Sequence, residues 1–308
     1  MSSGQDRWDV DWGEDDWIDN IQEVSQRIYD QKPIFDTLCL SGGGIKGINQ
    51  LGVLYYFWKD DMLKNISIYI GTSIGSIISY LLILGYSPLD ILDYIRQVDI
   101  TGDFRSLDIA NFSIDHALCR PITLRKCLTE LTQKKYQKIP TLKELYDTTN
   151  KKLVCVTYNF TEKKPEYLSP ESNPDLSCID ALTMSCSIPL VYPCFSYRGC
   201  EYIDGGVCDI FPVKYFDDGT HKILGIYTPG FFQGKGVFSY FCQVISIPIY
   251  ELVQKTQNSI SDNVEIIEIP GGSKGYLNFE LTDHETIKMF REGYNYIKNK
   301  SDKNLGVH

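Results

Sequence analysis

The sequence is 308 residues long and 43% hydrophobic, so it can bury the core of one large α/β domain or of two smaller domains. Its 40 acidic and 30 basic side chains give a formal net charge of -10, a field that repels phosphate and argues against nucleic acid as a partner. The ten cysteines form no CxxC pair and only four histidines are present, so no metal site is expected.

Residues 1–33 are acidic and rich in tryptophan, and we expect them to form an N-terminal extension with an amphipathic helix near residues 17–29. The first residues have neither the basic nor the apolar region of a secretory leader. The thiols are therefore expected to be reduced, and the protein to be cytoplasmic with peripheral contact to membranes, and not secreted.

The next segments alternate between strand and helix patterns. A strand is predicted over 34–40, a helix over 45–58 and a second strand over 66–70, followed by an apolar helix that ends near residue 84. The uncharged run from Asn65 to Leu89 is long enough to cross a bilayer, but Gly71, Thr72, Ser73 and Gly75 interrupt it. A buried strand followed by a buried helix explains it better, and this order predicts a parallel sheet.

The remaining chain shows no repeat and no linker that would divide it, so one domain is expected over 34–300, followed by a tail at 301–308. Strands are predicted at 152–158, 222–227 and 264–269, and helices at 179–187 and 283–298. The apolar run 237–253 is too short and too interrupted, by Gln243 and Pro248, to span a membrane. We interpret it as a core helix, with a pocket wall or a lipid-facing lid as the alternative.

Ser73 lies in Gly71-Thr72-Ser73-Ile74-Gly75, which fits the G-x-S-x-G pattern of a nucleophilic serine on a sharp turn from strand to helix. The two glycines permit the turn, and the helix that begins under the serine favours negative charge on a substrate oxygen. The backbone N–H of Ile74 is a candidate donor to that oxygen.

The loop Gly42-Gly43-Gly44-Ile45-Lys46-Gly47 follows the first strand and can present several N–H groups to an oxyanion. It also satisfies G-x-G-x-x-G, so a nucleotide-binding turn is an alternative. That alternative expects an acidic residue at the end of the second strand, whereas Asp60 and Asp61 fall before this strand. Lys46 is interpreted as a solvated lysine at the start of the helix, with contact to a phosphate group as the alternative, and it is not assigned to the site.

A nucleophilic serine needs a base, and the usual partner is histidine. The four histidines are His116, His221, His284 and His308. None of them lies in a catalytic sequence context, whereas Asp204 ends a short apolar strand and is followed by Gly205 and Gly206, which allow another segment to approach closely.

The three motifs stand in the order Gly42–Gly47, the Ser73 turn and Asp204-Gly205-Gly206, and this set resembles the patatin-like phospholipase family. The similarity extends to residues 140–146, 151–171 and 181–193 and to the closing helix from residue 281, so it covers about residues 36 to 300. The resemblance implies a three-layer α/β/α fold with a mostly parallel central sheet. It also implies a dyad of Ser73 as nucleophile and Asp204 as proton acceptor, an oxyanion hole built from Gly42, Gly43, Gly44 and Ile74, and no cofactor. Ile210 and Cys186 depart from the family pattern, which affects the expected shape of the pocket.

The function implied by the resemblance is a lipid acyl hydrolase that cleaves fatty-acyl esters of glycerophospholipids at a transiently bound membrane surface. The alternatives are a neutral glyceride lipase, a catalytically dead lipid-binding relative and a nucleotide-binding protein. A carboxylate with an ordinary pKa is a weak base for a serine, so we expect Asp204 to be partly buried, with a raised pKa.

Overall fold

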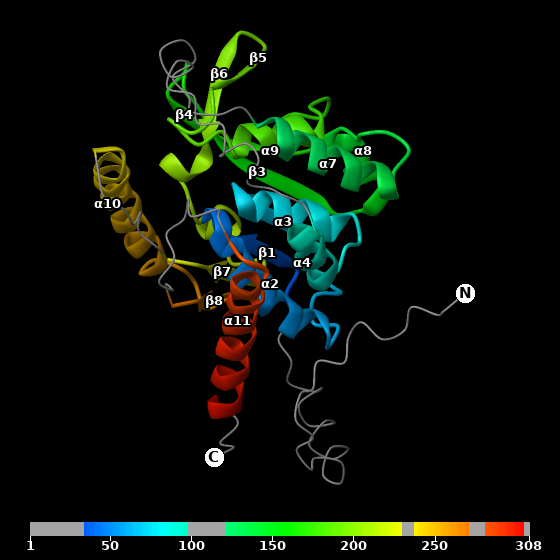
Figure 1. Ribbon diagram of the computed structural model, residues 1–308, viewed down its shortest axis with the longest axis vertical. Helices are drawn as coiled ribbons and strands as arrows, with labels where there is room; N and C mark the ends of the chain where they lie inside the picture. Colours follow the sequence, from blue (N-terminus) through cyan, green and yellow to red (C-terminus); the bar gives the residue numbers. More distant parts are fainter. Residues whose placement is uncertain (1–33, 98–120, 230–236, 271–280, 305–308) are drawn as a thin grey trace. The chain divides into compact units, whose positions relative to one another are not determined.

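A computed structural model describes residues 34–97, 121–229, 237–270 and 281–304 of the chain (Figure 1). The chain divides after Ile34 into two units, and every element below belongs to the second, Phe35–His308. The extension expected at residues 1–33 lies outside the described residues.

The strands are β1 (Thr37–Leu40), β2 (Ile68–Thr72), β3 (Lys152–Asn159), β4 (Lys164–Leu168), β5 (Phe195–Tyr197), β6 (Cys200–Asp204), β7 (Ile223–Tyr227) and β8 (Val264–Glu268). The α-helices are α2 (Gly47–Trp58), α3 (Ile74–Ile83), α4 (Pro88–Gln97), α7 (Ile122–Lys135), α8 (Leu142–Thr149), α9 (Cys178–Ser185), α10 (Val237–Gln257) and α11 (Asp283–Asn304). Three short 3-10 helices are η1 (Gly44–Lys46), η2 (Gly205–Val207) and η3 (Val213–Phe216).

The strands form one sheet in the order β5-β6-β3-β2-β1-β7-β8, and β4 also pairs with β3. The five strands from β3 to β8 are parallel to one another, whereas β4 and β6 run antiparallel to β3. The parallel sheet predicted from the strand–helix–strand pattern is therefore correct, with an antiparallel region added at one edge.

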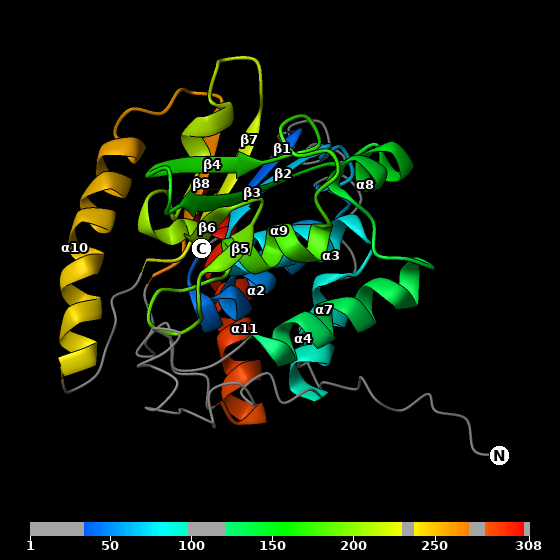
Figure 2. The ribbon, with the colours of Figure 1, turned by 90° about the horizontal axis from the view of Figure 1, so that it is seen from above.

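Side chains of the central strands alternate between two hydrophobic cores, as expected for a sheet that is covered on both faces. In β1, Leu38 and Leu40 join the larger core with residues of α2, α3, α4, α7, α8, α9 and α11, while Cys39 joins the smaller core on the other face. Val253 of α10 belongs to that smaller core, and α10 lies on the side of the sheet opposite to α2 and α3 (Figure 2). The fold is thus a three-layer α/β/α arrangement.

Some boundaries and environments differ from the sequence-based expectations. The closing helix α11 continues to Asn304 and so includes the first residues of the expected tail. Among the described residues no single helix is long and apolar enough to cross a membrane; only α3 and α4 together meet that condition, and they are bent by 120°. The run 237–253 is helical, but much of its surface is exposed, so the interpretation as a core helix was wrong.

Candidate active site

Ser73 follows the last residue of β2 and caps the N-terminus of α3, with φ 54° and ψ −122°. A side chain in this left-handed region is strained, and such strain is concentrated at functional sites. Two glycines make the turn possible: a Cβ atom at Gly71 would overlap the backbone of Gly75, and one at Gly75 would overlap the carbonyl oxygen of Leu40. The sharp turn from strand to helix is therefore built by the residues that predicted it.

The pairing register of β3 brings Ser73 and Asp204 together. Val156 is paired with Thr72 at the end of β2, and the next residue, Thr157, is paired with Asp204 at the end of β6. Because β4 occupies the other flank of β3, strands β2 and β6 lie on the same flank and meet end to end. Two residues that are 131 positions apart in the sequence thus become neighbours at one point of the sheet.

Asp204 is only 5% exposed, which agrees with the burial expected from the sequence. Burial raises the pKa of its carboxyl group to about 6, while hydrogen bonds from the Ser73 hydroxyl and the Gly206 N–H act in the opposite direction. The Gly206 N–H donates to Oδ1 of Asp204 at 2.6 Å. A side chain at Gly205 would overlap the carbonyl oxygen of Val156, so this glycine is required for the turn after β6 to lie against β3.

The predicted oxyanion donors fall into two groups. The N–H of Gly42 donates to the carbonyl of Ile210 at 2.8 Å, so Gly42 is not available as a donor and its assignment to the oxyanion hole was wrong. The N–H groups of Gly43, Gly44 and Ile74 have no acceptor in the described part of the chain. Gly47 lets this loop approach α3 closely, because a Cβ there would overlap the side chain of Ile74.

The family model for patatin-like phospholipases matches residues 38–217, which is more than half of the chain. The chain belongs to the patatin-like phospholipase family.

Two viral proteins are similar in sequence to this family member. A protein named probable lipid hydrolase 463L, from Invertebrate iridescent virus 6, is 32% identical over 182 residues, which are 58% of this chain and 62% of the relative. The uncharacterized protein R571 of Acanthamoeba polyphaga mimivirus is 27% identical over 61% of this chain and 64% of its own length. The matched segments therefore cover less than two thirds of either relative.

Two solved structures share the fold. VipD from Legionella pneumophila superposes with a TM-score of 0.56 over 88% of this chain and 67% of its own, at 18% identity. ExoU, in the complex ExoU-SpcU of Pseudomonas aeruginosa, has a TM-score of 0.53 over 89% of this chain and 52% of its own, at 19% identity. At these identities the similarity supports the patatin-like fold alone.

Two apolar pockets meet at the serine of this patatin-like domain. The first, of about 1080 Å³ and partly open to solvent, lies among α2, α3, α4 and α7. The second, of about 1090 Å³ and similarly open, runs from Gly42–Gly44 and Asp204 to the inner side of α10. Gly44, Ser73 and Ile188 line both pockets, so an ester at Ser73 has apolar space on two sides.

Sequence reasoning missed a buried serine that holds the nucleophile in place. Ser185, at the end of α9, is fully buried, and its Oγ accepts a hydrogen bond from the Ser73 N–H at 2.9 Å. The hydroxyl of Ser76 lies 3.2 Å from the same oxygen and donates to the Ser73 carbonyl at 2.6 Å. The available signal was a serine at the end of a short, mostly apolar helix, where a buried hydroxyl requires a partner.

The remaining candidates lie elsewhere or differ from expectation. His221 is 3.2 Å from Asp36, at the N-terminal ends of β7 and β1 and therefore at the opposite edge of the sheet from Ser73. His284 lies at the start of α11, and His116 and His308 fall outside the described residues.

Lys46 is buried, and its Nζ donates to the carbonyl of Pro229 at 3.1 Å, so the interpretation as a solvated lysine was wrong. No group of metal-binding side chains gathers within the described ranges.

Proposed function

We propose that this chain is a lipid acyl hydrolase in which Ser73 attacks the ester carbonyl and Asp204 acts as the base. The observation that carries the proposal is the contact between a serine in strained geometry and a buried carboxylate, at the junction of two apolar pockets. A serine on a tight turn with a basic partner is a recognised form of activated nucleophile.

In the first step the Ser73 O–H bond breaks, its proton moves to the Asp204 carboxylate, and Oγ bonds to the carbonyl carbon of the lipid ester. The tetrahedral adduct collapses, the C–O bond to the alcohol breaks, and the alcohol leaves with the proton held by Asp204. Water then gives a proton to Asp204 and attacks the acyl-enzyme, and Ser73 recovers that proton as the fatty acid departs. A pKa of about 6 suits this exchange, because the carboxylate is deprotonated at neutral pH and still basic enough to hold a proton transiently.

The negative charge on the carbonyl oxygen would be stabilised by the N–H groups of Gly43, Gly44 and Ile74, assisted by the N-terminus of α3. Removal of one such donor in other enzymes costs about a hundredfold or more in rate. The fixed backbone position of these donors supports their assignment, since a preorganised group needs no rearrangement during the reaction.

We propose glycerophospholipids as the substrate class, with neutral glycerides as a second candidate. The viral relative named probable lipid hydrolase supports a lipid substrate, and the apolar pockets support a long acyl chain. One observation favours neutral lipid: among the described residues that line the two pockets, none is lysine or arginine that could bind a phosphate group.

The test measures fatty acid released from phosphatidylcholine vesicles and from a triglyceride emulsion by the wild type, Ser73→Ala and Asp204→Asn. Ser79→Ala is the matched control, because Ser79 is buried on α3 but its hydroxyl has no hydrogen-bond partner among the described residues. We expect release by the wild type and by Ser79→Ala, and losses of a thousandfold or so in the other two variants. Release by Ser73→Ala at the wild-type rate would rule out the mechanism.

A fluorophosphonate probe gives an independent readout that needs no lipid. Labelling of the wild type but not of Ser73→Ala is expected for an activated serine. The assays with phosphatidylcholine vesicles and with triglyceride emulsion then distinguish the two lipid classes. An added chelator should leave every rate unchanged.

A further inference from the structure

Helix α10 has an inner and an outer face of different character. The inner residues Ser246, Ile249, Tyr250 and Val253 follow the spacing of one helical face and are buried or half-buried. On the outside, Tyr240, Val244 and Ile247 are 65%, 44% and 56% exposed. They too fall on one face, at i, i+4 and i+7, so apolar side chains line the solvent side of this helix.

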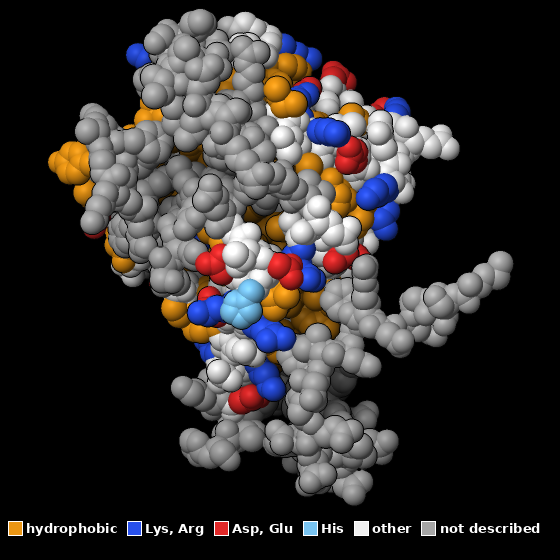
Figure 3. All heavy atoms as spheres, viewed as in Figure 1, with side chains coloured by type: hydrophobic (Ala, Val, Ile, Leu, Met, Phe, Trp, Pro, Cys, Tyr) orange, Lys and Arg blue, Asp and Glu red, His pale blue; other side chains and the backbone are white. Residues whose placement is uncertain are grey.

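Most of the exposed apolar side chains lie in the first half of the helix, and Leu252, 47% exposed, lies beyond it. Residues 237–250 contain no charged side chain, and Glu251 is the first to appear. Figure 3 shows hydrophobic side chains at the edge of the molecule where the N-terminal half of α10 lies. Exposed apolar side chains that gather on one face of a protein are a feature of interaction sites.

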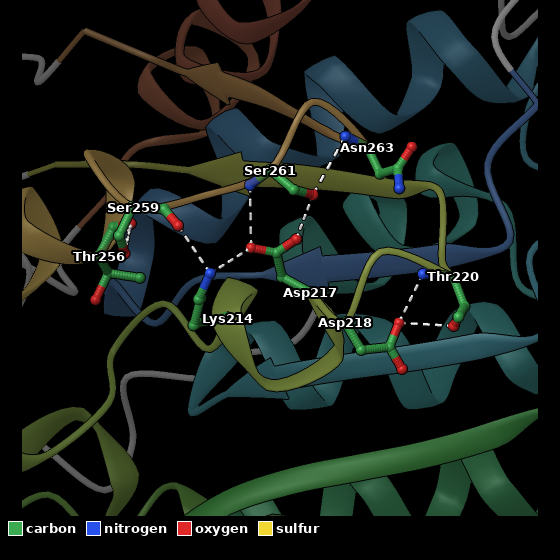
Figure 4. Close-up of polar contacts among 8 residues, drawn as sticks. All are labelled: Lys214, Asp217, Asp218, Thr220, Thr256, Ser259, Ser261 and Asn263. Carbon is green, nitrogen blue, oxygen red and sulfur yellow. Dashed lines mark hydrogen bonds and ion pairs between the residues drawn. The ribbon is translucent and has the colours of Figure 1, made fainter.

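The other end of α10 is fixed by polar contacts (Figure 4). Lys214 Nζ donates to the carbonyl of Ser259, just beyond the helix, at 2.8 Å and contacts Asp217 at 2.7 Å. The carboxylate of Asp217 is fully buried and also accepts from the N–H and the hydroxyl of Ser261. The helix is thus held firmly at its C-terminal end, while its apolar half is presented to the outside.

This outer surface is continuous with the candidate active site. Ile245 is 45% exposed and also lines the pocket that contains Ser73 and Asp204, together with Ile249 of the inner face. A second copy of the chain bound to this surface would cover the pocket beside Ser73. A lipid surface would supply the acyl chains that such a pocket can hold.

From these observations we infer that the N-terminal half of α10, with Tyr240, Val244 and Ile247 on its outer face, inserts into a lipid surface and places the pocket beside Ser73 against that surface. The inference rests on the proposed function for the origin of the substrate. Binding depends on apolar insertion, because this half of the helix carries no charge.

The test uses the full chain with Ser73→Ala, so that no lipid is hydrolysed, and measures co-flotation with neutral phosphatidylcholine vesicles. In that background Ile247→Gln is compared with Ile122→Gln at the start of α7, on the far side of the sheet from α10 (Figures 1 and 2). The control is well matched, since Ile122 is 66% exposed and Ile247 56%. We expect vesicle partitioning to fall about fivefold for Ile247→Gln, by about tenfold or more when Val244→Gln is added, and to stay unchanged for Ile122→Gln.

Equal partitioning of Ile247→Gln and its parent would overturn the inference, and so would equal losses in Ile247→Gln and Ile122→Gln. Sedimentation velocity without lipid tests the second-copy alternative: a dimer that Ile247→Gln converts to a monomer, with vesicle binding unchanged, also overturns it. Thermal unfolding confirms that each variant is folded. Flotation measures membrane binding and requires no turnover, whereas fluorophosphonate labelling of the wild type tests the proposed catalytic serine. A failure of the inference can therefore be distinguished from a failure of the proposed function.

Discussion

At the scale of single residues, the pKa of Asp204 sets the expected pH dependence of activity. The carboxylate must be deprotonated to accept the Ser73 proton, and burial raises its pKa to about 6. We expect kcat/KM for a soluble short-chain ester to fall about tenfold per pH unit below 6 and to level off above about 7. A profile with its midpoint near pH 4 would mean that Asp204 is solvated during the reaction or is not the base.

The same burial predicts a stability effect of opposite sign to the activity effect. The folded-state pKa of Asp204 is raised above its ordinary value of 3.8, so its contribution to stability is present at low pH and is lost as pH rises through about 6. The difference between the two pKa values corresponds to about 3 kcal/mol. Asp204→Asn does not titrate and should therefore gain stability relative to wild type, by up to about 3 kcal/mol, between pH 4 and pH 8. Urea unfolding at both pH values measures this, and a pH-independent difference would contradict it.

Ser185 is expected to position the nucleophile through its hydrogen bond to the backbone of Ser73. Ser185→Ala leaves that buried N–H without its acceptor, which costs about 1–3 kcal/mol, and should lower kcat about tenfold with little change in KM. Ser79→Ala is again the control, since its hydroxyl has no partner in the described part of the chain. Steady-state kinetics on a soluble ester tests the prediction, and equal kcat values for the two variants would remove Ser185 from this role.

At the scale of elements, the close packing of α11 against α2 depends on glycine. A Cβ at Gly293 would overlap the carbonyl oxygen of Asn49, and one at Gly52 would overlap that of Phe290, so the two backbones are in direct contact. The side chain of Asn49 also donates to the carbonyl of Met289 at 2.9 Å. Since α2 begins directly after the Gly42–Lys46 loop, this packing also supports the oxyanion donors.

Gly293→Ala should force the two helices apart and lower the melting temperature by about 5 °C, as expected for a loss of about 3 kcal/mol in a chain of this size. The comparison variant is Gly85→Ala, where φ is +84° but no atom lies within 4 Å of the added Cβ. Only backbone strain of about 1–2 kcal/mol applies there, so its effect should be smaller. Similar melting temperatures for the two variants would show that α11 can shift without cost.

The elements that could be predicted from the sequence are those whose pattern is local. The parallel strands β1, β2, β3, β7 and β8 are short apolar runs, and each lies within a few residues of its predicted position. Strand β4, Lys164–Leu168, has little apolar character, and only its pairing with β3 makes it a strand. The exposure of α10 was missed for a related reason. The sequence of an apolar helix does not indicate which of its side chains are buried, because burial depends on the elements that pack against the helix.

At the scale of the whole molecule, the site is assembled from several segments of the chain. The sequence identifies each segment separately but does not indicate how the segments lie relative to one another in the fold. The glycines around Ser73 and Asp204 have local roles in turns and could be read directly. The N–H of Gly42 is bound by Ile210, and the N–H of Ser73 by a residue 112 positions away, and neither contact has a local signature. The sequence therefore indicates the reacting groups, whereas the groups that hold them depend on the register of β3 and on the packing of α9.

The formal net charge of -10 leads to a last prediction, about the lipid surface itself. Anionic lipid should repel the protein as a whole, and residues 237–250 carry no charge that could reverse this locally. We expect fatty acid release from vesicles with 30% or so of anionic phosphatidylglycerol to be about fivefold slower than from neutral vesicles at low ionic strength, because the Debye length is then long. The difference should vanish in about 0.5 M salt, which screens the repulsion. A soluble neutral ester is the control, since its turnover should not respond to salt. Faster release from anionic vesicles at low salt would instead indicate a local basic surface that outweighs the net charge and guides the protein to the membrane.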